Sequence, residues 1–189
     1  MRQIADWEDI RPGDYWSAHG DAWISRAIQW VTQSYWNHSG QVIDGGMVQE
    51  ALTTVEENPL GNYKEAFNKG NLIVFRSQSP RTATLVALAK SRAKTGQPYA
   101  WAGTASLLVF VPLNRFLALF GLQLPTPFRK WEKCSELVLT RLRSQVLIAE
   151  AMDRRIPDLD WVMEVPDQDG FTPGDLVIYS LEACKTHPS

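Results

Sequence analysis

Two stretches of the chain have hydrophobic residues at the three- and four-residue spacing that is typical of amphipathic helices. The first runs from Asp21, the expected N-cap, to about Gln33, with apolar positions at Trp23, Ile24, Ala27, Ile28 and Val31. The second begins near Cys134, with apolar positions at Leu137, Val138, Leu142 and Val146. Each stretch is therefore predicted to form a helix with one buried face.

A hairpin is predicted between these two helices. Residues 41–43 and 47–52 have the composition of strands, and Asp44-Gly45-Gly46 between them is a strong turn signal. The hairpin would place His38 and Glu50 on neighbouring antiparallel strands. Because side chains alternate along a strand, Gln49 is expected on the opposite face from Glu50.

The remaining patterns predict shorter elements. They are a turn at 12–14 that leads into a strand at Tyr15, a loop at 58–62, a short helix at 63–68, a strand at 71–76, a helix from Pro80 to about Lys94, and a turn at 172–175 followed by an apolar strand. Residues 153–169 are acidic and irregular, which favours a surface excursion. This mixture predicts an α+β domain with a small antiparallel sheet or partial barrel packed by helices.

An unusually apolar stretch lies between residues 104 and 125. Pro112, Asn114 and Arg115 interrupt its middle, which argues against a helix that spans a bilayer. We expect a pair of short apolar helices that cover the core or wall an apolar pocket. Contact of this stretch with a membrane surface is the alternative.

Composition narrows the classes of protein. The 189 residues suit one domain, here 1–189 with an insertion at about 104–125, and 44% hydrophobic and 21% charged residues are ordinary for a globular protein. A net charge of −2 without a run of Lys or Arg makes nucleic acid an unexpected partner. The first nine residues carry acids instead of the apolar run of a signal peptide, so a cytoplasmic location is expected.

The cysteine at the start of the second helix is a candidate nucleophile. Unpaired N–H groups and the helix dipole favour the thiolate of Cys134 at that position. A nucleophilic cysteine needs a base, and the base needs a third group that holds its ring. His38 is the best-placed base, with Glu50 as the third group, because His187 lies in the polar tail and His19 in an expected loop. The alternative is an inert core thiol, a structural histidine and a solvated Glu50.

Other sites that use cysteine are not indicated. Cys134 and Cys184 are too few for a disulfide framework, and neither pairs with a histidine at the spacing of metal ligands. We therefore expect neither a metal nor an organic cofactor.

The chain contains the motifs Gly96-Gln97-Pro98-Tyr99-Ala100-Trp101-Ala102-Gly103 and, further on, Cys134-Ser135-Glu136-Leu137-Val138. These two motifs resemble those of NlpC-type papain-like cysteine peptidases. Pro12-Gly13-Asp14 and His38-Ser39-Gly40 precede the cysteine, whereas in ordinary members their counterparts follow it. This inverted order is similar to that of the circularly permuted, YiiX-like branch, as is the run Thr32, Ser34, His38. Ser39 departs from the pattern, since a β-branched residue is usual there, and the stretch 104–125 looks like an insertion.

The resemblance implies a permuted papain-like fold and a cysteine hydrolase. It implies that Cys134 is the nucleophile, His38 the general base and acid, and Glu50 the polar third member. It also implies that Tyr99 and Ser135 bind the substrate or the oxyanion, with core packing as the alternative for Tyr99, while Trp101 is expected to pack in the core.

The expected activity is thiol-dependent hydrolysis or transfer of an acyl group, with an amide as the scissile bond. The expected substrate is a small molecule, a peptide or a lipid-like acyl compound. The first alternative is a lipid acyltransferase or a lipid amide or ester hydrolase, which the apolar stretch at 104–125 suggests. The second, from another class, is a catalytically silent protein that uses the same fold to bind a small molecule or lipid.

Overall fold

The computed structural model describes residues 1–51, 55–79, 134–152, 154–165 and 171–187. Its strands are β1 (Arg2–Ile4), β2 (Tyr15–Ala18), β3 (His38–Ile43), β4 (Met47–Ala51), β5 (Val55–Pro59) and β6 (Leu72–Arg76). Its α-helices are α1 (Trp23–Thr32), α2 (Lys64–Asn68), α5 (Cys134–Ala151), α6 (Asp160–Glu164) and α7 (Pro173–Thr186). Short 3-10 helices are η1 (Trp7–Asp9), η2 (Asp44–Gly46), η3 (Leu60–Tyr63) and η4 (Pro157–Leu159). The α+β class predicted from the sequence is confirmed.

The strands form one open antiparallel sheet in the order β1-β6-β2-β3-β4-β5. The predicted hairpin is part of this sheet: β3 pairs with β4, so that Gly40 lies opposite Glu50 and Gln41 opposite Gln49. Both glycines of the connecting turn have φ +70°, a conformation that glycine adopts without steric cost. β3 begins at His38, three residues before the predicted strand, which brings the histidine into the sheet itself.

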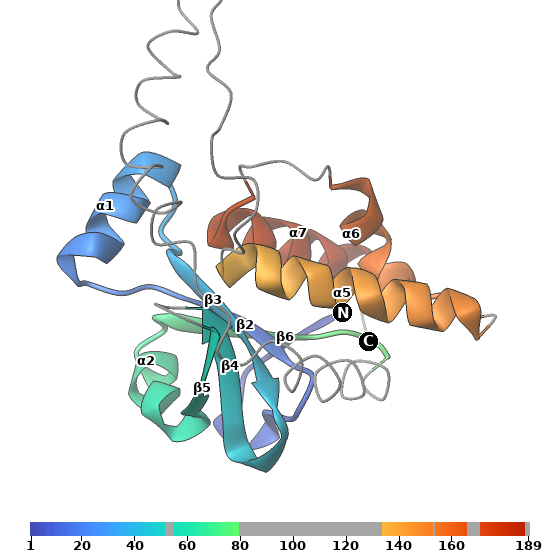
Figure 1. Cartoon of the computed structure of the whole chain (residues 1–189), viewed down its shortest axis with the longest axis horizontal. Helices are drawn as coiled ribbons and strands as arrows, with labels where there is room; N and C mark the ends of the chain where they lie inside the picture. Colours follow the sequence, from blue (N-terminus) through green and yellow to red (C-terminus); the bar gives the residue numbers. More distant parts are fainter. Residues whose placement is uncertain (52–54, 80–133, 153, 166–170, 188–189) are drawn as a thin grey trace, which may run out of the picture.

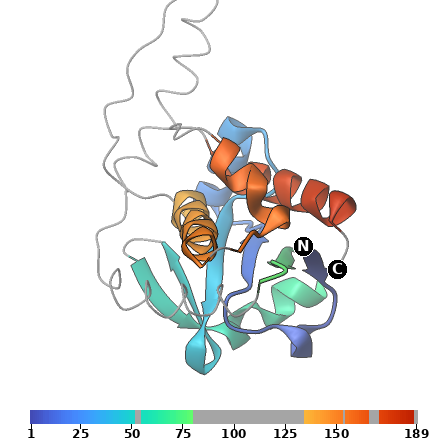
Figure 2. The same cartoon turned by 90° about the vertical axis from the view of Figure 1, so that its right-hand side faces the viewer.

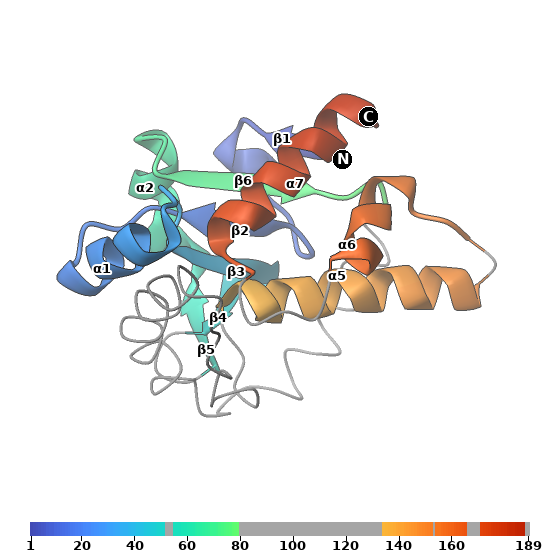
Figure 3. The same cartoon turned by 90° about the horizontal axis from the view of Figure 1, so that it is seen from above.

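One face of the sheet is covered by α5 and α7 (Figures 1 and 3). Tyr15 and Phe75 project from this face into a core shared with Leu142 and Val177. The four apolar positions that predicted the long helix are all buried, and each contributes roughly 1.5–3 kcal/mol by its removal from water. From Leu137 to Val146, α5 is thus fixed against the sheet by its predicted face.

The opposite face has a second, smaller core. Trp16, Val42, Val48 and Val74 project from the strands on that side and pack against η3 and α2. Figure 2 shows α5 nearly end-on, above the sheet, with α2 on the other side. Because side chains alternate along β3 and β4, the two faces receive different residues of the same hairpin.

The start of α1 differs from the prediction. Ala22, not Asp21, occupies the N-cap, and no side chain caps the helix there. The Asp21 carboxylate instead lies 3.2 Å from Nε2 of His19. The helix itself is confirmed, ending where Gln33 adopts φ +55°.

The predicted C-terminal strand is wrong, because Pro173–Thr186 is the helix α7. Thr172 accepts a hydrogen bond from the N–H of Asp175 at 3.1 Å, and Asp175 accepts one from the N–H of Thr172 at 2.8 Å. This capping box and a proline at the first helical position fix the start of the helix. Gly174 fits closely there, since an added Cβ would lie 2.1 Å from Oγ of Ser34.

Two other segments also differ from the predictions. The described part of the acidic stretch, residues 154–165, is not a surface excursion, because it forms η4 and α6, and Asp158, Leu159 and Val162 are buried. The loop expected at 58–62 begins only at Leu60, since Val55–Pro59 is the edge strand β5. The short helix expected at 63–68 and the strand expected at 71–76 are confirmed as α2 and β6, each one residue shorter at its start.

Three further predictions lie outside the described residues. They are the helix at 80–94, the motif at 96–103 with Tyr99 and Trp101, and the apolar stretch at 104–125. Among the helices that the structure describes, none is both long and apolar enough to cross a membrane.

Candidate active site

The first contact of the candidate site joins His38 to Glu50. Nε2 of His38 lies 2.5 Å from Oε2 of Glu50, on the neighbouring strands that the hairpin predicted. The Glu50 side chain is completely buried, whereas that of His38 is 18% exposed. The predicted neighbourhood is confirmed, and it consists of a buried carboxylate that contacts an imidazole open to solvent.

Two residues that sequence reasoning missed hold the other oxygen of the same carboxylate. Asn58, on β5, donates a hydrogen bond to Oε1 of Glu50 at 2.8 Å, and the hydroxyl of Tyr63, at the end of η3, donates to the same atom. No spacing motif joins 58 and 63 to 50. Only the pairing of β5 with β4, and the turn of η3 back over the sheet, brings them together.

These contacts decide the charge of the carboxylate. Burial raises the pKa of Glu50, but the hydrogen bond and charge of His38, with the hydrogen bonds of Tyr63 and Asn58, outweigh burial and lower it overall. Burial and the neighbouring Glu50 charge raise the pKa of Tyr63, so its hydroxyl stays protonated and remains a donor. Glu50 is thus held as a carboxylate and acts as an acceptor for all three groups.

Trp16 packs against both His38 and Tyr63. Its ring centroid lies 5.3 Å from that of His38, edge to face, and 4.8 Å from that of Tyr63. The indole lies directly over Gly40, where an added Cβ would be 2.5 Å from Cζ2 of Trp16. Glycine at this position of β3 therefore allows Trp16 to pack between the two rings.

Cys134 is the first residue of α5, which agrees with its predicted place in the first turn of a helix. One turn further on, Leu137 packs on Ala51 and Val55, at the end of the sheet where β3 begins with His38. The helix therefore starts at the same end of the sheet as the His38–Glu50 pair.

The rest of α5 lies on the other face of the sheet from that pair. Nη1 of Arg141 donates to Oε1 of Gln41 at 3.0 Å, and strand alternation places Gln41 on the face opposite His38. Gln49 lies on the face opposite Glu50, as predicted, together with Gln41, and it is fully buried. The body of α5 and the His38–Glu50 pair therefore lie on opposite faces of the sheet.

Ser135 and Tyr99 are the two residues predicted to bind the substrate or the oxyanion. The Ser135 hydroxyl is buried and donates to the carbonyl oxygen of Phe171 at 2.8 Å, so it fastens the first turn of α5 to the start of α7. A role for Ser135 in oxyanion binding would thus fall to its backbone N–H. Tyr99 lies outside the described residues, and its role stays a prediction.

The other two histidines have different surroundings. His19 stacks on Tyr35, with ring centroids 4.0 Å apart, and Nδ1 lies 2.9 Å from the carbonyl oxygen of Tyr35. His187 follows the last residue of α7 as its C-cap. Among the described residues, no three His, Cys, Asp or Glu side chains are grouped as metal ligands.

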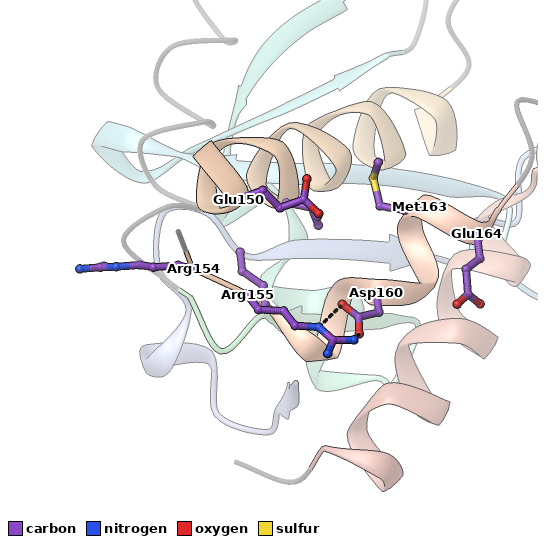
Figure 4. Close-up of a pocket in the computed structure, with 8 residues that line it drawn as sticks. Glu150, Arg154, Arg155, Asp160, Met163 and Glu164 are labelled. Carbon is purple, nitrogen blue, oxygen red and sulfur yellow. Dashed lines mark hydrogen bonds and ion pairs between the residues drawn. The ribbon is translucent and has the colours of Figure 1, made fainter. Parts of the chain in front are cut away.

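A pocket of about 540 Å³ lies elsewhere, between the C-terminal end of α5 and α6 (Figure 4). Arg154 and Arg155 line it together with Glu150, Asp160 and Glu164, and Arg155 pairs with Asp160. Glu150 is sixteen residues after Cys134 on the same helix, roughly 24 Å along its axis. This mixed-charge pocket contains none of the residues predicted for catalysis.

Comparisons with known proteins give a structural neighbour. No protein-family model matches the chain, and no curated protein matches its sequence significantly. Among solved structures, it is similar to the crystal structure of the metalloprotein YiiX from Escherichia coli O157:H7, DUF1105. The identity is 21% and the TM-score 0.43, over 72% of this chain and 82% of that chain.

Proposed function

We propose that this protein is a thiol-dependent hydrolase that cleaves an amide or another acyl bond, with Cys134 as nucleophile, His38 as general base and acid, and Glu50 as the group that orients His38. The observation that carries the proposal is the His38–Glu50 pair, in which a fully buried carboxylate contacts one ring nitrogen of a partly exposed histidine. A base held in this way is the second half of a nucleophile and base site.

The contact with Glu50 selects the tautomer of the base. A carboxylate that accepts from Nε2–H leaves Nδ1 with its lone pair, which is the nitrogen that can take a proton. Glu50 also stabilises the imidazolium that forms after proton transfer. In this mechanism, Nδ1 of His38 receives the thiol proton.

The reaction then proceeds in two steps. The Cys134 sulfur forms a bond to the substrate carbonyl carbon, and the proton held on His38 passes to the leaving amine or alcohol as its bond to that carbon breaks. In the second step, His38 takes a proton from water as the water oxygen adds to the thioester carbon. The C–S bond then breaks, the proton on His38 returns to the Cys134 sulfur, and the carboxylic acid is released. A second acceptor in place of water would give acyl transfer by the same residues.

The start of α5 provides the electrostatics for this chemistry. Backbone N–H groups in the first turn of an 18-residue helix have no partners within the helix, and they favour both a thiolate and a developing oxyanion. The proposal requires that the Cys134 sulfur reach His38 around the end of β3, beside the Leu137 contact with Ala51.

Alkylation by iodoacetamide tests the proposal without a known substrate. At pH 7 an ordinary thiol is only a few per cent ionised, so a thiolate at Cys134 would react up to about thirty times faster than free cysteine. The rate should fall about tenfold or more in His38→Ala. Cys184 is the internal control, because burial raises the pKa of its thiol.

Mass spectrometry of the two cysteine peptides separates the rates. If Cys134 reacts no faster than free cysteine, and His38→Ala leaves its rate and pH profile unchanged, the proposal is wrong. A positive result would justify a panel of peptide amides, small-molecule amides and acyl esters, with Cys134→Ala as the inactive control.

A further inference from the structure

The structure assigns Tyr63 as the positioning residue of the candidate site: its hydroxyl fixes the Glu50 carboxylate, and its ring fixes Trp16 against His38. This inference rests on the proposed function for its catalytic meaning and extends it to a residue that no motif identified.

The two oxygens of Glu50 have separate partners. Oε1 accepts from Tyr63 and Asn58, whereas Oε2 lies against Nε2 of His38. Two donors on one oxygen set the plane of the carboxylate, so that Oε2 is directed at the histidine ring. Without these two donors, the carboxylate could rotate about its terminal torsion, because that torsion has a broad range of allowed angles.

A second path joins Tyr63 to the histidine through aromatic packing. The Tyr63 ring lies against Trp16, and the edge of Trp16 lies against His38. Tyr63 therefore contacts both supports of His38, the carboxylate on one side and the indole on the other. η3 and α2 are packed on this face of the sheet, and Tyr63 belongs to η3. The position of these two elements therefore determines where Tyr63 contacts the site.

The Tyr63→Phe variant separates these two contributions, because it removes the hydroxyl and keeps the ring. We expect the carboxylate charge to concentrate on Oε2, which favours the imidazolium and moves the His38 titration to higher pH. We also expect the alkylation rate of Cys134 at pH 7 to fall about threefold or more, as the base loses its fixed orientation. Tyr63→Leu, which removes both, should have the larger effect.

Nuclear magnetic resonance of the imidazole nitrogens measures the tautomer and titration of His38 without any thiol chemistry. The chain has three histidines, and His19 and His187 are internal references. Tyr35→Phe is the matched control: it also removes one hydroxyl, which donates to Asn71 at 2.8 Å, from a residue outside the site. It should leave both His38 and Cys134 unchanged.

The outcomes distinguish this inference from the proposed function. A shifted His38 titration in Tyr63→Phe with an unreactive Cys134 would support the positioning role and overturn the thiol mechanism. A reactive, His38-dependent Cys134 whose rate and histidine titration are both unchanged in Tyr63→Phe would overturn the positioning role. Asn58→Ala, which removes the other donor to Oε1, repeats the test if Tyr63→Phe does not fold.

Discussion

Two buried carboxylates, those of Asp14 and Glu50, lie at different places on this sheet and have chemically different partners. Asp14, just before β2, is held by the Arg76 guanidinium through two contacts of 2.7 Å and by the backbone N–H of Arg11 at 2.9 Å. Glu50, on β4, is held by a histidine, a tyrosine and an asparagine. One carboxylate faces a permanent cation, and the other faces an imidazole, a group that can both donate and accept a proton.

The partners of Asp14 and Glu50 differ in their effect on the pKa of the carboxyl group. The guanidinium of Arg76 remains charged, since the hydrogen bond with Asp14 raises its pKa further. Burial raises the pKa of Asp14 despite Arg76, whereas the donors around Glu50 overcome burial and lower its pKa. A fixed ion pair fastens β6 to the turn before β2, while a carboxylate whose partner titrates suits proton transfer.

The largest effect is expected at the fixed pair. Arg76→Leu leaves the Asp14 charge buried beside a single backbone donor, which should lower the free energy of unfolding by about 3–5 kcal/mol. Urea denaturation measures this loss, and Arg155→Leu, which breaks an exposed pair with Asp160, is the control with little expected change.

Arg76→Leu also tests whether the Asp14–Arg76 pair is independent of the candidate thiol site. Under conditions where Arg76→Leu remains folded, the alkylation rate of Cys134 should equal that of the unsubstituted protein. Equal stability of Arg76→Leu and Arg155→Leu would show that the Asp14 pair does not support the fold.

The hairpin and the long helix could be predicted because their signals are local. A turn with two glycines specifies the pairing of β3 and β4, and strand alternation then places Glu50 beside His38. Apolar positions three and four residues apart specify the buried face of α5. These two elements contain all three residues of the predicted thiol site.

The C-terminal helix differs from its predicted strand although a local signal for the helix is present. Leu176, Val177, Ser180 and Ala183 are buried at helical spacing, and Thr172 with Asp175 forms a capping box. The apolar run at 176–179, taken alone, favours a strand because it is short and ends in an aromatic residue. A window extended to residue 183 favours the helix instead.

Other features depend on tertiary contacts that no local pattern contains. Asp158 looks like a surface acid, but it is buried, accepts from the N–H of Gln78 at 2.9 Å and lies 3.0 Å from the ammonium group of Met1. Tyr63 and Asn58 likewise reach Glu50 only after β5 and η3 fold over the sheet. Sequence reasoning found the titrating pair but not the donors that fix it.

A smaller effect is expected at Gly40, beside Trp16. Gly40→Ala places a Cβ 2.5 Å from Cζ2 of Trp16, a side chain that is 1% exposed and has no room to move away. The crowding should lower the free energy of unfolding by about 1–3 kcal/mol and displace the indole from His38. Gly61→Ala is the matched control, because nothing lies within 4 Å of its added Cβ. Indole fluorescence and urea denaturation report both effects, and equal behaviour of the two variants would show that Trp16 is not held by close packing.

The smallest effect on stability is expected at the titrating carboxylate itself. Glu50→Gln keeps the shape of the side chain and its acceptor oxygen, and it exchanges charged hydrogen bonds for neutral ones, a loss of about 1 kcal/mol at pH 7. Because the folded pKa of Glu50 lies below its ordinary value of 4.5, the carboxylate contributes stability above that pH, and this contribution is lost as the pH falls through the folded pKa.

The difference in unfolding free energy between the two proteins should therefore shrink as the pH falls through the folded pKa of Glu50, as measured by urea denaturation from pH 5 to pH 3, below the ordinary range of histidine titration. Glu150→Gln, at an exposed position on the far end of α5, should give a difference that does not change in this way. A Glu50→Gln difference that grows toward low pH would mean that burial, and not the three donors, controls Glu50. The two buried carboxylates would then behave alike, and the distinction between a fixed pair and a titrating pair would fail.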